Sequence, residues 1–251
     1  MSTLLMVVIF AMIGSLVSLS GGILLLMNRH RDKLARYATA FAAGALLAEA
    51  FVDLLPEAFE SGDGHEVSMA IFAGIIIFFL LEGSIQWFHR HRRHSSKTDP
   101  VVPLIVIGDT VHNFIDGVAI AAGFLVDPLT GIIVTLAVAA HEIPQEIGDF
   151  GMLLNKGVKR GKVLLYNVLS AIATIVGAVA FFLIGQQNDL PLAPILGLVA
   201  GFFIYIAVSD IIPSIHHEKS RRTIARDSII LIIGAIVVSV AIFSLRNFIE
   251  I

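Results

Sequence analysis

The stretch VVPLIVIGDTVHNFIDGVAIAAGFLV, residues 101–126, places the ionisable side chains His112 and Asp116 in the middle of a long apolar segment. A second apolar segment, residues 129–155, carries HEIPQE at residues 141–146. Each segment exceeds the roughly 20 apolar residues that a helix needs to cross a bilayer. A charged group at the centre of such a helix costs about 2.5–3.5 kcal/mol, so it faces a partner, a water-filled cavity or an ion. We expect the two polar clusters to face each other and to hold an ion.

The composition predicts an all-α polytopic membrane protein. Of the 251 residues, 57% are hydrophobic and 15% are charged, whereas a soluble domain has about 45–50% apolar and about 25% charged residues. The chain has no cysteine, which excludes disulfides and thiolate ligands. The first apolar stretch lacks a basic leader and is long enough to span, so we expect a membrane helix there and not a cleaved signal peptide.

Eight segments are long and apolar enough to cross the bilayer. Short connections join them, so we predict a single transmembrane domain over residues 1–251. The spans are expected at about 4–27, 37–58, 67–88, 101–125, 130–154, 163–185, 191–215 and 227–248.

Sixteen of the seventeen Lys and Arg residues fall on one of the two sides that this order of spans defines. The first, third, fifth and seventh connections carry four basic residues each, whereas the second, fourth and sixth carry none. Arg246, near the C-terminus, is the remaining basic residue. Because cytoplasmic loops are enriched in Lys and Arg, we expect the odd-numbered loops in the cytoplasm and both termini outside.

Spans two and seven share a motif. Gly44, Asp53 and Pro56 in span two recur with the same spacing as Gly201, Asp210 and Pro213 in span seven. The two spans cross in opposite directions, and inverted repeats are a transporter architecture with the substrate site near the midplane. We predict an inverted repeat of spans 1–3 and 6–8 around a central pair, spans 4 and 5. Asp53 and Asp210 could lie on an ion pathway or cap helices that the prolines break.

Helical spacing places the polar side chains of the central spans on one face of each helix. At about 100° per residue, one arc holds Asp109, His112, Asn113 and Asp116 in span four, and another holds His141, Glu142, Gln145, Glu146 and Asp149 in span five. Pro144 cannot donate to the carbonyl of Ala140, so we expect a kink that frees a backbone acceptor beside this face.

The ligand types at these two faces favour a divalent transition metal. Imidazole nitrogens suit Zn, Fe, Ni and Cu(II), and carboxylate oxygens extend the choice to Mn. Calcium and magnesium prefer shells made of oxygen alone. Hydrogen bonding between helices is the alternative. It would account for Glu146 or Asp149 singly, but not for two histidines and at least three carboxylates at one depth.

The pair of motifs GDTVHNFIDG, residues 108–117, and HEIPQEIGD, residues 141–149, closely resembles the paired signature of the ZIP (Zrt/Irt-like protein) metal transporters, nearest the LIV-1-type pattern. The eight spans and the histidines of the third loop extend the resemblance over the whole chain. The resemblance implies uptake of Zn²⁺, or of Fe²⁺, Mn²⁺ or Cd²⁺, into the cytoplasm by alternating access. The metal ion is then the substrate, no prosthetic group is expected, and the chain is expected to form a homodimer in the lipid bilayer.

The resemblance also implies two adjacent metal sites. The first would use His112, Asp116, His141 and Gln145, and the second would use Asn113 and Glu142 with Asp116 shared. Thr174 aligns where some relatives carry an acidic ligand, which weakens the second site. The full set of predicted ligands is His112, Asn113, Asp116, His141, Glu142, Gln145 and Glu146, with Asp109, Asp149, Asp53 and Asp210 as pathway or supporting residues.

Two other functions fit parts of the sequence. His141-Glu142-x-x-Gln145 is one residue short of the His-Glu-x-x-His motif of zinc proteases, but the His112 cluster has no role in that scheme. A metal sensor without ion flux would use the same ligands as a transporter. Nothing in the sequence predicts a nucleic-acid partner, and the small size of the loops favours a bacterial inner-membrane protein.

Overall fold

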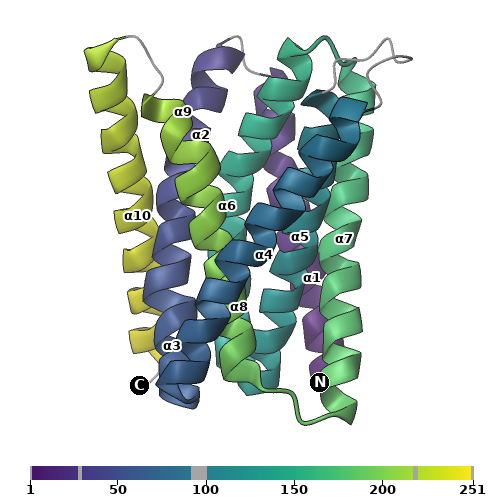
Figure 1. Cartoon of the computed structure of the whole chain (residues 1–251), viewed down its shortest axis with the longest axis vertical. Helices are drawn as coiled ribbons and strands as arrows, with labels where there is room; N and C mark the ends of the chain where they lie inside the picture. The colour runs from purple at the N-terminus through teal and green to yellow at the C-terminus, as the bar shows by residue number, and fades with distance from the viewer. Residues whose placement is uncertain (1, 28–29, 92–100, 217–219, 250–251) are drawn as a thin grey trace.

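A computed structural model describes residues 2–27, 30–91, 101–216 and 220–249, and every element in these ranges is a helix. The helices run side by side in one bundle (Figure 1). They are α1 (Thr3–Met27), α2 (Arg31–Ala48), η1 (Glu49–Leu54), α3 (Leu55–Ser61), α4 (Gly64–His91), α5 (Val101–Val126), α6 (Pro128–Asn155), α7 (Arg160–Gln187), α8 (Leu192–Tyr205), η2 (Ile206–Ile211), α9 (Ile212–His216) and α10 (Arg221–Ile249).

The eight predicted spans coincide with eight helical segments, of which two are compound: α2–η1–α3 forms span two and α8–η2–α9 forms span seven. Seven of the eight segments are long and apolar enough to cross a membrane by length and composition. The eighth, α6, is 28 residues long and carries the acidic cluster that the sequence assigned to span five. The predicted all-helical membrane fold is therefore confirmed.

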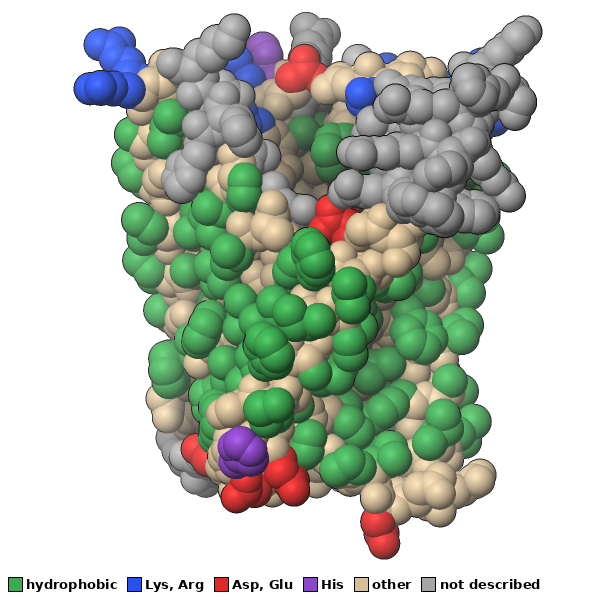
Figure 2. Space-filling view, in the orientation of Figure 1, with side chains coloured by type: hydrophobic (Ala, Val, Ile, Leu, Met, Phe, Trp, Pro, Cys, Tyr) green, Lys and Arg blue, Asp and Glu red, His purple; other side chains and the backbone are tan. Residues whose placement is uncertain are grey.

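The two ends of the bundle differ in charge. Both termini lie at one end, and the last turns of α1, α6 and α9 and the first turns of α2, α7 and α10 lie at the other (Figure 1). On the face drawn in Figure 2, Lys and Arg lie at the end opposite the termini, with a few acidic side chains beside them. The termini end shows Asp, Glu and His, and a green apolar surface lies between the two ends. Large side chains such as Leu16, Phe72 and Ile229 are more than half exposed on this surface. An apolar belt between polar ends is the surface that a lipid bilayer covers.

Two wide helical turns interrupt spans two and seven at matching positions. The N–H of Leu55 bonds to the carbonyl of Ala50 in η1, and that of Ile212 bonds to the carbonyl of Ala207 in η2. A bond to the fifth residue back defines a π-helical turn. Pro56 and Pro213 follow directly, and each lacks the N–H that an α-helical bond requires. The irregularity predicted at these prolines is thus a wide turn, whereas α6 stays helical through Pro144.

Helix pairing follows the predicted inverted repeat. A Cβ atom at Gly44 of α2 would overlap the carbonyl oxygen of Leu231 on α10, and one at Gly201 of α8 would overlap that of Ile71 on α4. Span two thus packs on span eight, and span seven packs on span three. Small residues let membrane helices approach this closely. The repeated glycines serve the same packing role in both halves.

We expect Gly44→Ala to destabilise the bundle because the new methyl group must push α10 away from α2. Overpacking of this kind costs about 1–3 kcal/mol, which lowers the melting temperature by about 2–10 °C. Melting in detergent measures the effect. Gly83→Ala on α4 is the matched control, since a Cβ there meets nothing within 4 Å. An unchanged melting temperature for Gly44→Ala would contradict the close approach of these helices.

Candidate metal centre

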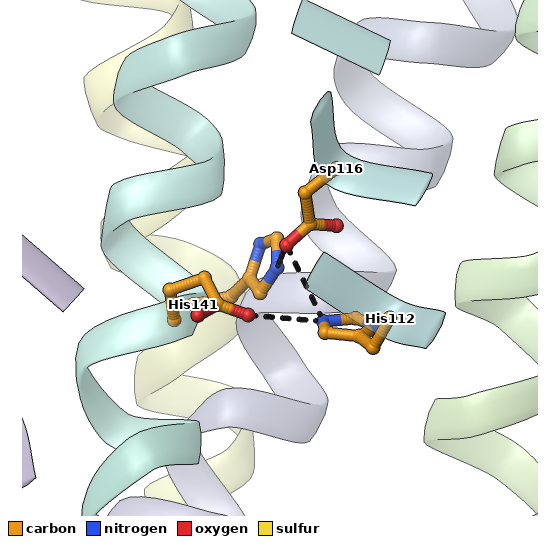
Figure 3. Close-up of side chains that lie close together, drawn as sticks. His112, Asp116 and His141 are labelled. Carbon is orange, nitrogen blue, oxygen red and sulfur yellow. Dashed lines mark ion pairs between the residues drawn. The ribbon is translucent and has the colours of Figure 1, made fainter. Parts of the chain in front are cut away.

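Four side chains from α5 and α6 meet at the middle of the bundle. His112 and Asp116 lie one turn apart on α5, and His141 and Glu142 lie side by side on α6. One ligand atom from each of the four residues lies within 4.8 Å of the others. Their exposed fractions are between 0 and 2%. Figure 3 shows His112, Asp116 and His141 directed toward one another across the gap between the two helices.

The distances between these atoms suit a tetrahedral metal ion. His112 Nε2 is 3.3 Å from Glu142 Oε1 and 3.6 Å from Asp116 Oδ2, and His141 Nε2 is 3.5 Å from the same Asp116 oxygen. Zinc bound tetrahedrally at 2.0–2.1 Å to nitrogen and oxygen holds its ligand atoms about 3.3 Å apart. These three separations therefore lie close to the spacing that a zinc ion imposes, and all four ligand atoms lie within 4.8 Å of one another. Two imidazoles and two carboxylates also suit Fe²⁺.

The same atoms lack hydrogen bonds. Within the described part of the chain, no hydrogen bond reaches His112 Nε2, His141 Nε2, Glu142 Oε1 or either oxygen of Asp116. Buried polar atoms in proteins are nearly always hydrogen-bonded. A cation at the centre of the cluster would satisfy these atoms together, because all of them can donate a lone pair.

Two residues hold the ligands in place from other helices. Glu49 Oε2 lies 2.5 Å from His141 Nδ1, and both side chains are fully buried. When Nδ1 donates its proton to Glu49, the lone pair of His141 is on Nε2 and faces the cluster. Ser18 of α1 donates its hydroxyl hydrogen to Glu142 Oε2 over 2.8 Å. This leaves Glu142 Oε1 to face His112.

Comparison with known proteins shows the family of the chain. A family model described as ZIP Zinc transporter matches residues 2–103 and 89–241 of the chain. The chain belongs to the ZIP family. The resemblance read from residues 108–117 and 141–149 is thereby confirmed.

Three curated relatives illustrate the similarity of this ZIP-family chain to proteins with transporter names. Zinc transporter ZIP10 of Danio rerio is 38% identical over 119 residues, which are 47% of this chain and 14% of that protein. Zinc transporter ZIP4 of Mus musculus is 38% identical over 119 residues, 47% of this chain and 18% of that protein. Zinc transporter ZIP13 of Pongo abelii is 30% identical over 222 residues, 82% of this chain and 66% of that protein. The chain spans less than a fifth of the ZIP10 and ZIP4 relatives. All three relatives are named as zinc transporters, and none is named as a protease, the enzyme that the sequence offered as an alternative.

The histidines and carboxylates that meet in this ZIP-family chain include three residues of the first predicted site and one of the second. His112, Asp116 and His141 lie together as predicted, and Glu142, which the resemblance assigned to the second site, is the fourth member of the group. Gln145 is half-buried, and its Oε1 atom is buried without a hydrogen bond from the described residues.

Asn113 is engaged in a separate polar network with α7. Its amide Nδ2 donates to Asp109 Oδ1 and to Ser170 Oγ, both over 3.0 Å. Its Oδ1 atom accepts a 2.8 Å hydrogen bond from Thr174, the residue that the family pattern aligned with an acidic ligand. Ser170 also donates to Asp109. Thr174 thus contacts a predicted ligand of the second site, and the Oδ1 atom of Asn113 is occupied by the hydroxyl hydrogen of Thr174.

The other predicted residues lie on either side of the cluster. Glu146 is fully buried, and the negative charges of Asp109 and Asp149 act on it. These three residues lie on the side of the basic loops, since α5 runs away from those loops and α6 runs toward them (Figure 1). Asp53 lies on the side of the termini, and the side chain of Asp210 is outside the described part of the structure.

Glu49 was not among the predicted site residues. We expect Glu49→Ala to weaken zinc binding by about 10–100-fold, the usual effect of removing the partner of a metal-bound histidine. Glu49→Gln, which keeps an acceptor for His141 Nδ1, should fall between Glu49→Ala and the unmodified chain. Competition with a fluorescent zinc chelator in detergent measures the affinity, with the exposed Glu66→Gln as control. Equal affinity in Glu49→Ala and the unmodified chain would show that His141 does not depend on this contact.

Proposed function

We propose that this chain transports divalent transition-metal ions, with Zn²⁺ as the main substrate, through the cluster of His112, Asp116, His141 and Glu142. The main support is the convergence of ligand atoms from these four buried residues, midway along the two central helices. Membership of a family described as zinc transporters supports a transported ion at this cluster, and not an ion that only stabilises the fold.

We propose inward movement by alternating access. The four ligands are almost completely buried, so an ion reaches them only when helices move. We assign the end with the basic loops to the cytoplasm, because cytoplasmic loops are enriched in Lys and Arg. A membrane potential that is negative inside favours inward movement of a cation by about 2.3 kcal/mol per charge per 100 mV. On the cytoplasmic side, Asp109, Glu146 and Asp149 continue the polar face of α5 and α6 toward the basic loops. They offer the departing ion a polar route.

The proposed setting is a lipid bilayer with both termini outside. Both termini lie at the end opposite the basic loops (Figure 1), which supports this orientation. A bacterial inner membrane and a homodimeric assembly are further predictions from the sequence. The relatives described above are vertebrate proteins, and they offer no support for the bacterial location.

Uptake of ⁶⁵Zn²⁺ into proteoliposomes tests the proposed function. The purified chain should give saturable uptake that liposomes without protein lack, and Fe²⁺, Mn²⁺ and Cd²⁺ should compete in the order of their affinities for the site. An inward-negative potassium diffusion potential should raise the initial rate. Zinc bound to the purified chain without any flux would favour a metal sensor and would contradict the proposal.

A further inference from the structure

Arg246 departs from the charge pattern of the chain. It is the one Lys or Arg that the sequence places on the side of the termini, and it lies in the last turn of α10. Its Nη2 atom is 2.8 Å from Asp53 Oδ1 and 3.6 Å from Glu57 Oε2. Asp53 is 1% exposed, whereas the Arg246 side chain is 27% exposed. The guanidinium group therefore reaches from the rim of the bundle to a buried carboxylate.

The partners of Arg246 belong to an acidic row that ends at the metal cluster. Glu49, Asp53 and Glu57 follow one another at four-residue intervals along η1 and α3. Glu49 contacts His141 at the inner end of the row, and α3 lies at the end of the bundle that holds the termini (Figure 1). Glu60 and Asp127 add negative charge around Arg246 at the outer end. The row thus connects the outer rim to a ligand of the cluster.

The contact between Arg246 and Asp53 is not a closed two-pronged pair. Asp53 Oδ2 and Arg246 Nε are both buried, and neither has a hydrogen bond among the described residues. Tight arginine–carboxylate pairs use two parallel hydrogen bonds, which fix the geometry. With a single contact, the guanidinium can exchange for another cation at lower cost. The second oxygen of Asp53 is available to that cation.

We propose that Arg246 is a tethered cation that competes with the incoming metal ion for Asp53 and Glu57. This inference rests on the proposed transport function. The metal ion enters by displacing the guanidinium from these carboxylates and then passes to the cluster beside Glu49. Arg246 thereby sets the outside metal concentration at which entry begins, and it neutralises the buried Asp53 while no ion is present.

A purely structural role would give a different result, and the same helix supplies the control. Arg226 lies near the other end of α10 and pairs with Asp227, which is also 1% exposed. Arg36 contacts Asp227 as well, at 2.6 Å. Arg226→Gln therefore removes an arginine from a buried aspartate away from the acidic row. Loss of structure reduces the amount of active transporter and hence the maximal rate, whereas loss of competition changes KM.

The experiment measures initial rates of ⁶⁵Zn²⁺ uptake into proteoliposomes against the outside zinc concentration. Removing one positive charge about 5 Å from a divalent ion should lower KM for zinc by at least about fivefold in Arg246→Gln. Arg246→Lys keeps the charge and should stay within about twofold of the unmodified KM. Arg226→Gln should leave KM unchanged. Unchanged KM in folded Arg246→Gln, with uptake intact in the unmodified chain, would overturn the inference. Absent uptake in the unmodified chain would instead overturn the proposed function.

A second variant covers the case in which Arg246→Gln does not fold. Glu57 is only partly buried, so Glu57→Gln should be tolerated. The carboxylate of Glu57 attracts a doubly charged metal ion more strongly than it attracts the singly charged guanidinium. Removing this charge therefore weakens metal binding more than it weakens the competition from Arg246, and KM for zinc should rise by about threefold or more. A KM equal to that of the unmodified chain would overturn the inference, because the ion would then not pass this carboxylate.

Discussion

His112→Ala should abolish saturable zinc uptake and lower the affinity for zinc by more than about 100-fold. The substitution removes a nitrogen that lies 3.3–3.6 Å from two other ligand atoms of the cluster. Loss of a direct ligand should exceed the roughly 10–100-fold effect of losing a supporting partner. Uptake into proteoliposomes and zinc binding in detergent measure the two effects on the same preparation.

His65→Ala is the matched control for this substitution. His65 is exposed near the start of α4, so its loss should change neither uptake nor binding. Equal melting temperatures in the absence of metal would show that His112→Ala affects the site and not the fold. Uptake equal in His112→Ala and the unmodified chain would rule out a metal path through the cluster.

Asp116→Asn should remove the stabilisation that zinc gives to the folded chain. Asp116 contacts both histidines, and neither of its oxygens has a hydrogen bond among the described residues. Zinc at 100 times its dissociation constant should stabilise the unmodified chain by about 2.7 kcal/mol, which raises the melting temperature by about 5–10 °C. The amide keeps the size of the side chain but loses its charge, so the zinc-dependent shift should disappear.

Asp189→Asn serves as the control, since Asp189 is exposed between α7 and α8. It should melt and respond to zinc like the unmodified chain. Melting curves with zinc and with a chelator measure both variants. A full zinc shift in Asp116→Asn would mean that the stabilising ion binds elsewhere on the molecule.

Much of the fold follows from the sequence because the membrane limits the choices. Only helices and closed barrels satisfy the backbone in lipid, so long apolar segments predict membrane helices, and seven of the eight segments meet this test in the structure. The matching Gly44 and Gly201 predicted the repeat, and both occupy close helix contacts. The wide turns before Pro56 and Pro213 were foreseen only as breaks. A proline can be preceded by a π-helical turn, as Pro56 and Pro213 are, or can lie within a continuous α-helix, as Pro144 does in α6. The helices packed around the proline decide between these two outcomes.

The contacts of the site that the sequence predicts are those between residues one turn apart on a single helix. His112 and Asp116 are four residues apart, so a single helix turn brings them together, and the neighbouring His141 and Glu142 lie on the facing helix. Glu49 contacts His141 from a third helix, ninety-two residues earlier in the chain. Its only signal was a carboxylate inside an apolar span, one turn before Asp53. The depth that it shares with His141 depends on how α2, η1 and α6 pack.

Zinc-edge anomalous diffraction from crystals grown with Zn²⁺ tests the central claim most directly. We predict a peak between α5 and α6, about 2.0–2.2 Å from His112 Nε2, His141 Nε2 and one oxygen each of Asp116 and Glu142. The peak should be absent in His112→Ala crystals grown in the same way. Zinc peaks found only at other histidines, with none between these four side chains, would contradict the account.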